Sequence, residues 1–576
     1  MSLNSLLNEL ADTEKQHIMR GLERALEKKK DIRPAFSHTW VRPYVPKDAS
    51  IVKQYQIENT EVSLYSLSNE TEDLYHVLPL EYKVEKEKAK IISEVKESLA
   101  EHHAQDMDFS DPGRVREFIK TRGKNLIRRI VEDSEIKLDG SRQEEIKQIE
   151  ELSQILSKYT AGYGVLETML KDTDVEDIYV DAPAEQNNVY VELNVGEEIR
   201  DKCRTNVYLS SNDMGSLLSR FRFESGEPFS EAYPVLEADL SEYETRITAI
   251  GEPLSSDGIA LALRRRNTEP WTLPKLIKVG SLTPLSAGLL SFLIDGRSTI
   301  LVAGSRGAGK TTLLGAMMLE FPKSQRILTI EDTKELPAES MQDIGYNVQS
   351  LKTASGMSKG EMEPDEVLRV SLRLGESAIV MGEVRGEEAK TLYEAMRAGT
   401  AGSAVMGTIH GNTAQSVYKR VVHDIGISKE SFAATDIVVI AGIVRPGGTQ
   451  KRERRVTQIA EYGKEGGEFY DLMRFDQELE PTDFFKRNSE KIGEIARSWG
   501  LSYNEAVENI RLRAKMREKM VETSLEKNDE RILNAEWVAK ANNKFWNLIS
   551  EYGTEKDYER IEKEWMMWFE ERARYA

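Results

Sequence analysis

Cysteine is almost absent from this sequence of 576 residues, which contains one, Cys203. A disulfide within the chain is therefore excluded, and so is a zinc site built on cysteines, because such a site needs two or more thiolates. Aromatic residues are also scarce, at 7%. The sequence has no run of 18 or more apolar residues, so it predicts no transmembrane helix.

The sequence has fewer basic than acidic residues: 79 Lys and Arg against 98 Asp and Glu, which gives a net charge of −19. Proteins that bind nucleic acid need a basic surface to displace counterions, so this balance argues against a general polyanion binder. The apolar fraction of 39% is low, which together with 31% charged residues indicates long exposed helices around modest cores. Residues 1–30 are predicted to be helical and lack the pattern of a signal peptide, so we expect a cytoplasmic protein.

Changes in composition along the chain predict four domains, in line with about 150 residues per domain. We expect an N-terminal mixed and helical domain at 1–158, a second N-terminal α+β domain at 159–270, an α/β domain at 271–462 and a helical extension at 463–576. In the second domain, strands are expected at 177–180, 189–193, 206–209, 245–250 and 259–264, with a helix at 211–221. Helix and strand alternate between 275 and 460, which is typical of a parallel sheet.

A phosphate-binding loop is indicated by residues 304–311, GSRGAGKT, which match G-x-x-x-x-G-K-[ST]. An apolar run precedes it and good helix formers follow it, which is the strand–loop–helix order that such a loop requires. Glycines let backbone N–H groups approach the phosphates, and the helix N-terminus adds positive potential. The predicted nucleotide contacts are Gly304, Ser305, Arg306, Gly307, Ala308, Gly309, Lys310, Thr311 and Thr312. Lys310 would reach the β- and γ-phosphates, and Thr311 would bind Mg²⁺.

Three further apolar runs are each followed by polar groups. The runs are 326–330, followed by Glu331, Asp332 and Glu335; 378–381, followed by Glu383; and 405–409, followed by His410. Side chains at the carboxyl ends of parallel strands point into the ligand crevice, so we expect these groups to face the phosphates. For His410, a purely structural role competes with a functional one.

These motifs, in this order, resemble those of the secretion and pilus-assembly ATPases, the hexameric motors of type II secretion, type IV pili and the archaellum. The resemblance rests on the phosphate loop, IEDTKEL at 330–336, GEVRG at 382–386, GTIH at 407–410, GYGVL at 162–166 and PVLEA at 234–238. AMRAGTAG at 395–402 and the tail around 500–502 are similar to the archaeal branch. The sequence departs from the family pattern at Arg306 and Ala308, where Thr and Ser are frequent.

The resemblance implies a RecA-like P-loop NTPase domain, preceded by a small PAS-like α+β domain, with helical extensions at both ends. ATP and Mg²⁺ are the implied ligands. Glu335, or else Glu331 or Asp332, would orient the attacking water, and Glu383 would support Mg²⁺ through water. His410 would sense the γ-phosphate.

The resemblance also implies arginine fingers from the second N-terminal domain, for which the candidates are Arg246, Arg264 and Arg265. A hinge is expected near residues 267–275, between that domain and the motor domain. The implied assembly is a homohexamer at the inner face of the membrane, which acts on an integral-membrane platform protein. Pilin-like or secreted subunits would be indirect partners, and no nucleic acid is expected.

Two other functions stay open. The first is a conjugation ATPase that translocates DNA or protein, and the second is a nucleotide-gated scaffold with little turnover. In the tail, apolar residues at helical spacing over 492–499, followed by a capping box at Ser502 and Glu505, suggest either packing on the motor domain or a DNA-binding helix–turn–helix. The apolar cluster 565–569 is expected to pack on this chain or a neighbouring subunit, with contact to a platform protein as the alternative.

Overall fold

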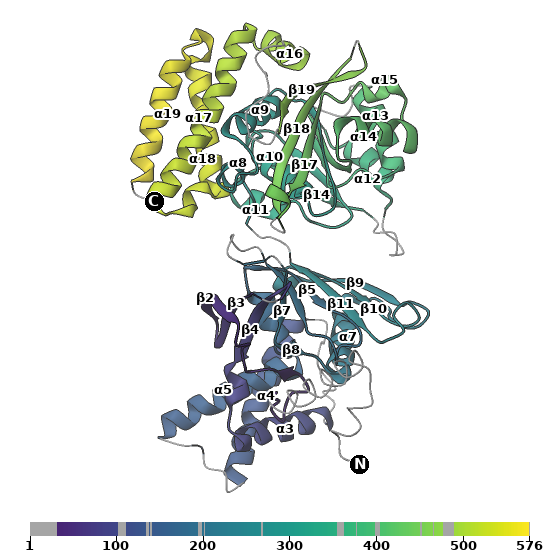
Figure 1. Cartoon of the computed structure of the whole chain (residues 1–576), viewed down its shortest axis with the longest axis vertical. Helices are drawn as coiled ribbons and strands as arrows, with labels where there is room; N and C mark the ends of the chain where they lie inside the picture. The colour runs from purple at the N-terminus through teal and green to yellow at the C-terminus, as the bar shows by residue number, and fades with distance from the viewer. Residues whose placement is uncertain are drawn as a thin grey trace, which may run out of the picture. The chain divides into compact units, whose positions relative to one another are not determined.

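Two compact units, Met1–Arg266 and Asn267–Ala576, make up the chain (Figure 1). The computed structural model describes residues 31–68, 70–101, 111–133, 138, 141–193, 199–200, 202–265, 269–353, 362–375, 377–397, 404–449, 452–464, 466–475 and 489–574. The helix expected over residues 1–30 lies outside this part, as do residues 267–268 of the expected hinge. In the described part, no helix is long and apolar enough to cross a membrane.

A twisted, mostly antiparallel sheet forms the centre of the first unit. Its strands are, in spatial order, β2 (Ala49–Ile57), β3 (Thr60–Leu67), β4 (Asp73–Pro79), β7 (Lys202–Thr205), β6 (Tyr190–Leu193), β5 (Val175–Val180), β11 (Ala260–Arg265), β10 (Thr245–Ile250) and β9 (Val235–Leu240). Strand β4 pairs with β7 in parallel, with Asp73 opposite Cys203. The sheet therefore crosses the boundary predicted at residue 158, because pairing with β7 protects an edge that β4 would otherwise expose. The division of this unit into two domains stays a prediction.

Helices cover the sheet of the first unit on its apolar face. They are α3 (Lys86–Glu101), α4 (Pro112–Asp133), α5 (Arg142–Thr160), α6 (Leu166–Lys171) and α7 (Ser211–Ser225), of which α3, α4 and α5 pack against one another (Figure 1). Along β10, Ile247 and Ala249 enter the core while Arg246 and Thr248 lie on the other face. Alternation with a period of two is what a half-buried strand requires.

The elements expected between residues 177 and 264 are confirmed, but one expected strand is shorter than predicted and β7 and β9 were not expected. The strand expected at 206–209 is shortened to β8 (Val207–Tyr208), which pairs with β1 (Trp40–Val41), and β7 ends just before it at Thr205. Asn206 separates them, because its buried side chain accepts a hydrogen bond from Val77 N at 2.8 Å and donates to the carbonyls of Arg42 and Val77, each at 2.8 Å. A buried Asn thus interrupts the β pattern by binding the backbone itself.

A largely parallel sheet forms the centre of the second unit. Its strands are, in spatial order, β14 (Val348–Lys352), β13 (Ile327–Glu331), β15 (Ala378–Met381), β16 (Val405–His410), β12 (Thr299–Gly304), β17 (Ile437–Val444), β18 (Glu453–Gly463) and β19 (Glu468–Arg474). The strands from β14 to β17 are parallel, and β18 and β19 add antiparallel pairs. The predicted mixture of α and β structure is confirmed, and the sheet continues past the domain boundary predicted at residue 462.

Helices lie on both faces of this sheet (Figure 1). They are α8 (Leu273–Lys278), α9 (Pro284–Asp295), α10 (Lys310–Met318), α11 (Ala338–Asp343), α12 (Pro364–Ser371), α13 (Glu387–Arg397), α14 (Ala414–Lys419) and α15 (Lys429–Phe432). In β12, Ile300 and Val302 join the core that contains α9 and α10, while Leu301 and Ala303 join the core that contains α14. Strand β12 is therefore buried on both faces, as strands of parallel sheets are.

The tail of the chain packs onto the face of the sheet that carries α9 and α10. It consists of α16 (Glu490–Ser498), α17 (Tyr503–Lys527), α18 (Ala535–Tyr552) and α19 (Tyr558–Ala573). Ile492, Ile510 and Ala539 belong to the same core as α9 and α10, which confirms the packing interpretation of the tail. The cluster at 565–569 also packs within the chain, because Trp565 and Phe569 are buried and stack with ring centroids 5.1 Å apart.

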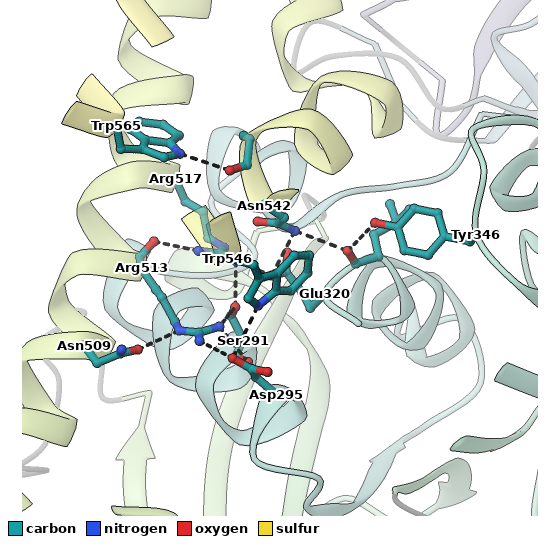
Figure 2. A network of polar contacts seen from close by, with 12 residues as sticks. Ser291, Asp295, Glu320, Tyr346, Asn509, Arg513, Arg517, Asn542, Trp546 and Trp565 are labelled. Atoms are coloured by element: carbon teal, nitrogen blue, oxygen red, sulfur yellow. Dashed lines mark hydrogen bonds and ion pairs between the residues drawn. The ribbon is translucent and has the colours of Figure 1, made fainter. Parts of the chain in front are cut away.

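A buried network of polar groups joins the tail to α9 and to the end of α10 (Figure 2). Arg517 on α17 forms an ion pair with Glu320, which lies just after α10. Asn542 on α18 donates to the Leu319 carbonyl at 3.2 Å. Arg513, one helical turn before Arg517, donates to the Ser291 hydroxyl at 3.0 Å. Helix α10 is therefore held at its C-terminal end by two helices of the tail.

Candidate nucleotide-binding and catalytic site

The predicted phosphate loop connects the end of β12 to the start of α10. Gly304 ends the strand, and a Cβ there would lie 2.3 Å from the carbonyl oxygen of Ala441, so the close approach of β17 requires glycine. Gly307 and Gly309 have φ values of 76° and 84°, in the left-handed region that favours glycine. The loop thus has the glycine-dependent backbone that a phosphate cradle needs, directly before a helix N-terminus.

Lys310 is the first residue of α10 and lies between the loop and two acidic groups. Its ammonium donates to the Ser305 carbonyl at 3.0 Å. Burial lowers the pKa of Lys310, against the opposing influence of the Glu383 and Glu335 carboxylates. The structure therefore brings the predicted phosphate-binding cation together with two of the predicted acids. Thr311 and Thr312 follow in the first turn of the same helix.

Glu331 is the last residue of β13, and its carboxylate turns back onto its own loop. Its Oε1 accepts hydrogen bonds from the backbone N–H groups of Glu335 and Leu336, both at 2.9 Å. The residue is 4% exposed, and burial raises the pKa of its carboxyl to about 7. Glu335, by contrast, is exposed. Of these two predicted acids, Glu335 is therefore accessible to water, whereas the carboxylate of Glu331 is bound to backbone N–H groups.

Glu383 follows β15 and is the centre of a chain of charged groups. It accepts a hydrogen bond from Arg385 at 2.5 Å, and its other oxygen lies 3.2 Å from Nε2 of His410. Arg385 also donates to Asp332 at 3.0 Å. Burial raises the pKa of Glu383, but the hydrogen bond from Arg385 and the positive charges of Arg385 and Lys310 outweigh it, so the pKa lies below its ordinary value. The Glu383 carboxylate is thus held in its ionised form.

The register of the parallel strands explains why these groups meet. Gly304 at the end of β12 lies opposite His410 at the end of β16. Met381 at the end of β15 lies opposite Gly407 in β16. The carboxyl ends of β12, β13, β15 and β16 therefore share one edge of the sheet, which is where open α/β sheets bind their ligands.

The donor chemistry of this edge fits Mg²⁺. Mg²⁺ prefers oxygen ligands and keeps several waters, so that one or two side chains plus substrate phosphates complete its shell. Thr311 offers a hydroxyl oxygen in the first turn of α10, and Glu383 offers an ionised carboxylate whose charge acts on the neighbouring Lys310. Among the described residues, no group of three or more His, Cys, Asp or Glu side chains forms a protein-only metal site.

Three residues at this edge that were not assigned from the sequence make contacts with the predicted site. Arg385 joins Asp332 to Glu383, and Thr408 donates to the Gly382 carbonyl at 2.5 Å, which holds the backbone just before Glu383. Arg454 on β18 donates to the Gly307 carbonyl at 3.1 Å. Arg385 and Thr408 belong to the motifs GEVRG and GTIH, so the sequence could have indicated both residues. Arg454 has no such signal, because the antiparallel pairing of β18 with β17 brings it to the loop.

The candidate arginine fingers belong to the first unit. Arg246 on β10 and Arg264 on β11 are opposite each other in register, and Arg246 pairs with Glu237 at 3.0 Å. Arg265 donates to the Asp172 carbonyl. Their role as fingers stays a prediction.

Comparison with known proteins places these motifs in a family. The model of the family described as "Type II/IV secretion system protein" matches residues 163–488. A putative conjugal transfer protein of Mycobacterium tuberculosis is 30% identical over 272 residues, which are 46% of this chain and 74% of that protein. An uncharacterised protein of the archaeon Methanocaldococcus jannaschii is 29% identical over 252 residues, which are 43% of this chain and 91% of that protein.

Among solved structures, the Legionella pneumophila ATPase DotB matches with a TM-score of 0.39 and 16% identity, over 64% of this chain and 94% of that chain. The family model covers more than half of the 576 residues and contains the phosphate loop, both acidic motifs and the histidine box. The resemblance drawn from the motifs is thereby confirmed, and the chain belongs to the type II/IV secretion system family of ATPases.

Proposed function

We propose that this protein is an Mg²⁺-dependent ATP hydrolase whose turnover powers filament assembly or protein secretion through a membrane platform. One observation carries the proposal. A phosphate loop with its lysine lies at the sheet edge where the Glu335 loop, Glu383 and His410 also lie. Phosphoryl transfer to water needs three groups: a cation that binds the phosphates, an accessible acid that orients the water and an ionised acid that supports the metal.

In the proposed reaction, the loop N–H groups and Lys310 hold the phosphates of ATP, and Glu335 accepts a proton from a water that attacks the γ-phosphorus in line. The bond from that phosphorus to the β-phosphate oxygen breaks, and ADP and phosphate leave. Thr311 and Glu383, the latter through water, would hold Mg²⁺, which neutralises phosphate charge when bound. His410, beside Glu383, senses the γ-phosphate.

We further propose that the chain acts as a homohexamer, with a RecA-like domain in the second unit and a PAS-like domain in the first, whose relative angle changes during turnover. Arg246, Arg264 or Arg265 would supply positive charge to the transferred phosphoryl group, which in related chemistry raises rates by roughly 10³ to 10⁵. Membership of the secretion family supports a place at the cytoplasmic face of the membrane, against an integral-membrane platform protein.

The test is ATP hydrolysis by the purified full chain with Mg²⁺. Lys310→Ala should abolish turnover, because it removes the phosphate-binding cation. Lys540→Ala is the matched control, since Lys540 is exposed on α18 and pairs with Glu536 at 2.7 Å. Glu335→Gln should still bind ATP while hydrolysis slows by about 10²- to 10⁴-fold. Turnover retained by Lys310→Ala would contradict the proposal, and absence of turnover in the wild type would favour the nucleotide-gated scaffold.

A second candidate, a conjugation ATPase, is favoured by the M. tuberculosis relative, which is described as a putative conjugal transfer protein. It predicts that added DNA stimulates hydrolysis several-fold. The net charge of −19 weighs against DNA binding, so we expect no stimulation at physiological salt. Stimulation that Lys310→Ala abolishes would support the second candidate over the first.

A further inference from the structure

Glu331 has a more specific arrangement than any other acid at the sheet edge. One of its oxygens, Oε1, accepts from both Glu335 N and Leu336 N at 2.9 Å, so the side chain ties the end of β13 to the residue four positions later. Bonds from backbone N–H groups to a carboxylate are stronger and more directional than neutral ones. The loop that carries Glu335 is thus fixed by a side chain that lies beneath it.

The side chain of Glu331 also contacts the second acidic motif. A Cβ on Gly382 would lie 2.9 Å from Cγ of Glu331, so the glycine before Glu383 leaves the room that Glu331 occupies. Gly382 is in turn held by Thr408, which donates to its carbonyl at 2.5 Å. Glu331 therefore lies between the backbone that carries Glu335 and the backbone that carries Glu383.

The same geometry argues against Glu331 as the base. Its Oε1 is taken by two N–H groups, and its Oε2 is buried and has no hydrogen-bond partner among the described residues. A general base must come within hydrogen-bond reach of the water that it deprotonates. An oxygen that is closed to solvent cannot meet that water without movement of the loop.

We propose that Glu331 is a positioning residue that fixes the backbone of Glu335 and Leu336 and thereby holds the Glu335 carboxylate in place for the attacking water. Glu331 itself does not accept the proton of that water. This inference rests on the proposed ATP hydrolysis and assigns a different task to each acid of the same motif. Misplacement of a reacting group by about 1 Å can cost on the order of 10²-fold in rate, so the fixed loop matters for kcat.

The distinguishing variant is Glu331→Gln. Glutamine keeps an Oε1 that accepts both N–H bonds, and it cannot act as a base. We expect Glu331→Gln to keep kcat within about threefold of the wild type, whereas Glu335→Gln loses about 10²-fold or more. Glu331→Leu has a similar size and no acceptor, so kcat should fall about 10²-fold while KM for ATP stays unchanged. A Glu331→Gln variant as slow as Glu335→Gln would overturn the inference.

A second measurement does not depend on activity. Amide hydrogen exchange of the full-length protein, followed by mass spectrometry on peptides that cover residues 331–337, reports the two N–H bonds directly. Exchange should stay slow in Glu331→Gln and become about tenfold faster or more in Glu331→Leu, because the amides lose their acceptor. If the Glu331→Leu substitution leaves this exchange unchanged, the positioning role of Glu331 is overturned. If exchange changes as expected but Lys310→Ala still hydrolyses ATP, the proposed function fails and the loop contact stands.

Discussion

Glu320 and Arg517 form an ion pair that solvent does not reach, since their side chains are 0% and 4% exposed. Arg517 also donates to the Ser291 hydroxyl and to the Arg513 carbonyl, each at 2.7 Å, and burial lowers the pKa of its guanidinium (Figure 2). Glu320 comes directly after the helix that begins at the phosphate loop. The tail therefore contributes one charge of a pair whose other charge belongs to the segment that follows α10.

Removal of one partner of this pair should destabilise the second unit strongly, because the remaining charge stays buried without compensation. We expect Arg517→Met alone to lower the free energy of unfolding by about 3–5 kcal/mol. The double variant Glu320→Leu with Arg517→Met should be less destabilised than the sum of the single variants. Urea denaturation followed by tryptophan fluorescence measures the double-mutant cycle, and strictly additive effects would show that the two charges are not coupled.

A methyl group on Gly288 should disturb the packing of α9 on α17. A Cβ there would lie 2.5 Å from the Ile510 carbonyl oxygen and 2.7 Å from the Ala514 nitrogen, which are backbone atoms. We expect Gly288→Ala to cost about 1–3 kcal/mol of stability. Gly493→Ala in α16 is the control, because its Cβ would meet a flexible Arg497 side chain at 3.5 Å. The control should be stabilised by about 0.5–1 kcal/mol. Equal melting temperatures for both variants would contradict the expected clash.

The buried carboxyl of Glu331 should make stability depend on pH. Burial raises its folded-state pKa from 4.5 to about 7. The folded state therefore holds this proton more tightly than the unfolded state, so its contribution is present below pH 4.5 and is lost as pH rises to about 7. The loss approaches about 3 kcal/mol. Glu331→Gln removes this titration, so its melting temperature relative to the wild type should rise between pH 5 and pH 8. A constant difference across that range would contradict the raised pKa.

Ring assembly should appear as a concentration dependence of activity. If Arg246, Arg264 or Arg265 acts as a finger on a phosphoryl group held by another copy, hydrolysis per protomer rises as copies associate. We expect specific activity to increase between nanomolar and micromolar protein and then to level off. Gel filtration at both concentrations gives the oligomeric state. If the rate per protomer stays constant while the oligomeric state changes, arginine fingers supplied by a neighbouring copy are contradicted.

The strand–loop–helix order around Lys310 could be predicted from the sequence because it depends on residue type and spacing along the chain. The run before Gly304, the acids after β13 and β15 and the capping box at Ser502 are local patterns, and each is found as expected. Arg454 could not be assigned in this way, because its contact with Gly307 depends on how β18 pairs.

The different contacts of the two acids Glu331 and Glu335 could not be predicted from the sequence either. Glu331 and Glu335 are the same residue type four positions apart, and only the direction of the side chain shows which one binds the backbone. In the first unit, the pairing of β4 with β7 joins residues about 130 positions apart, for which no local pattern exists.

The packing of α17 and α18 onto the end of α10 has a consequence for synthesis of the protein. The helix that starts at Lys310 is complete early, but the groups that enclose its far end, Arg517 and Asn542, are made about 200 residues later. Until they leave the ribosome, the Glu320 carboxylate and the apolar face around it stay open to solvent or to chaperones. The second unit thus cannot bury the Glu320 carboxylate until α17 and α18 have been synthesised.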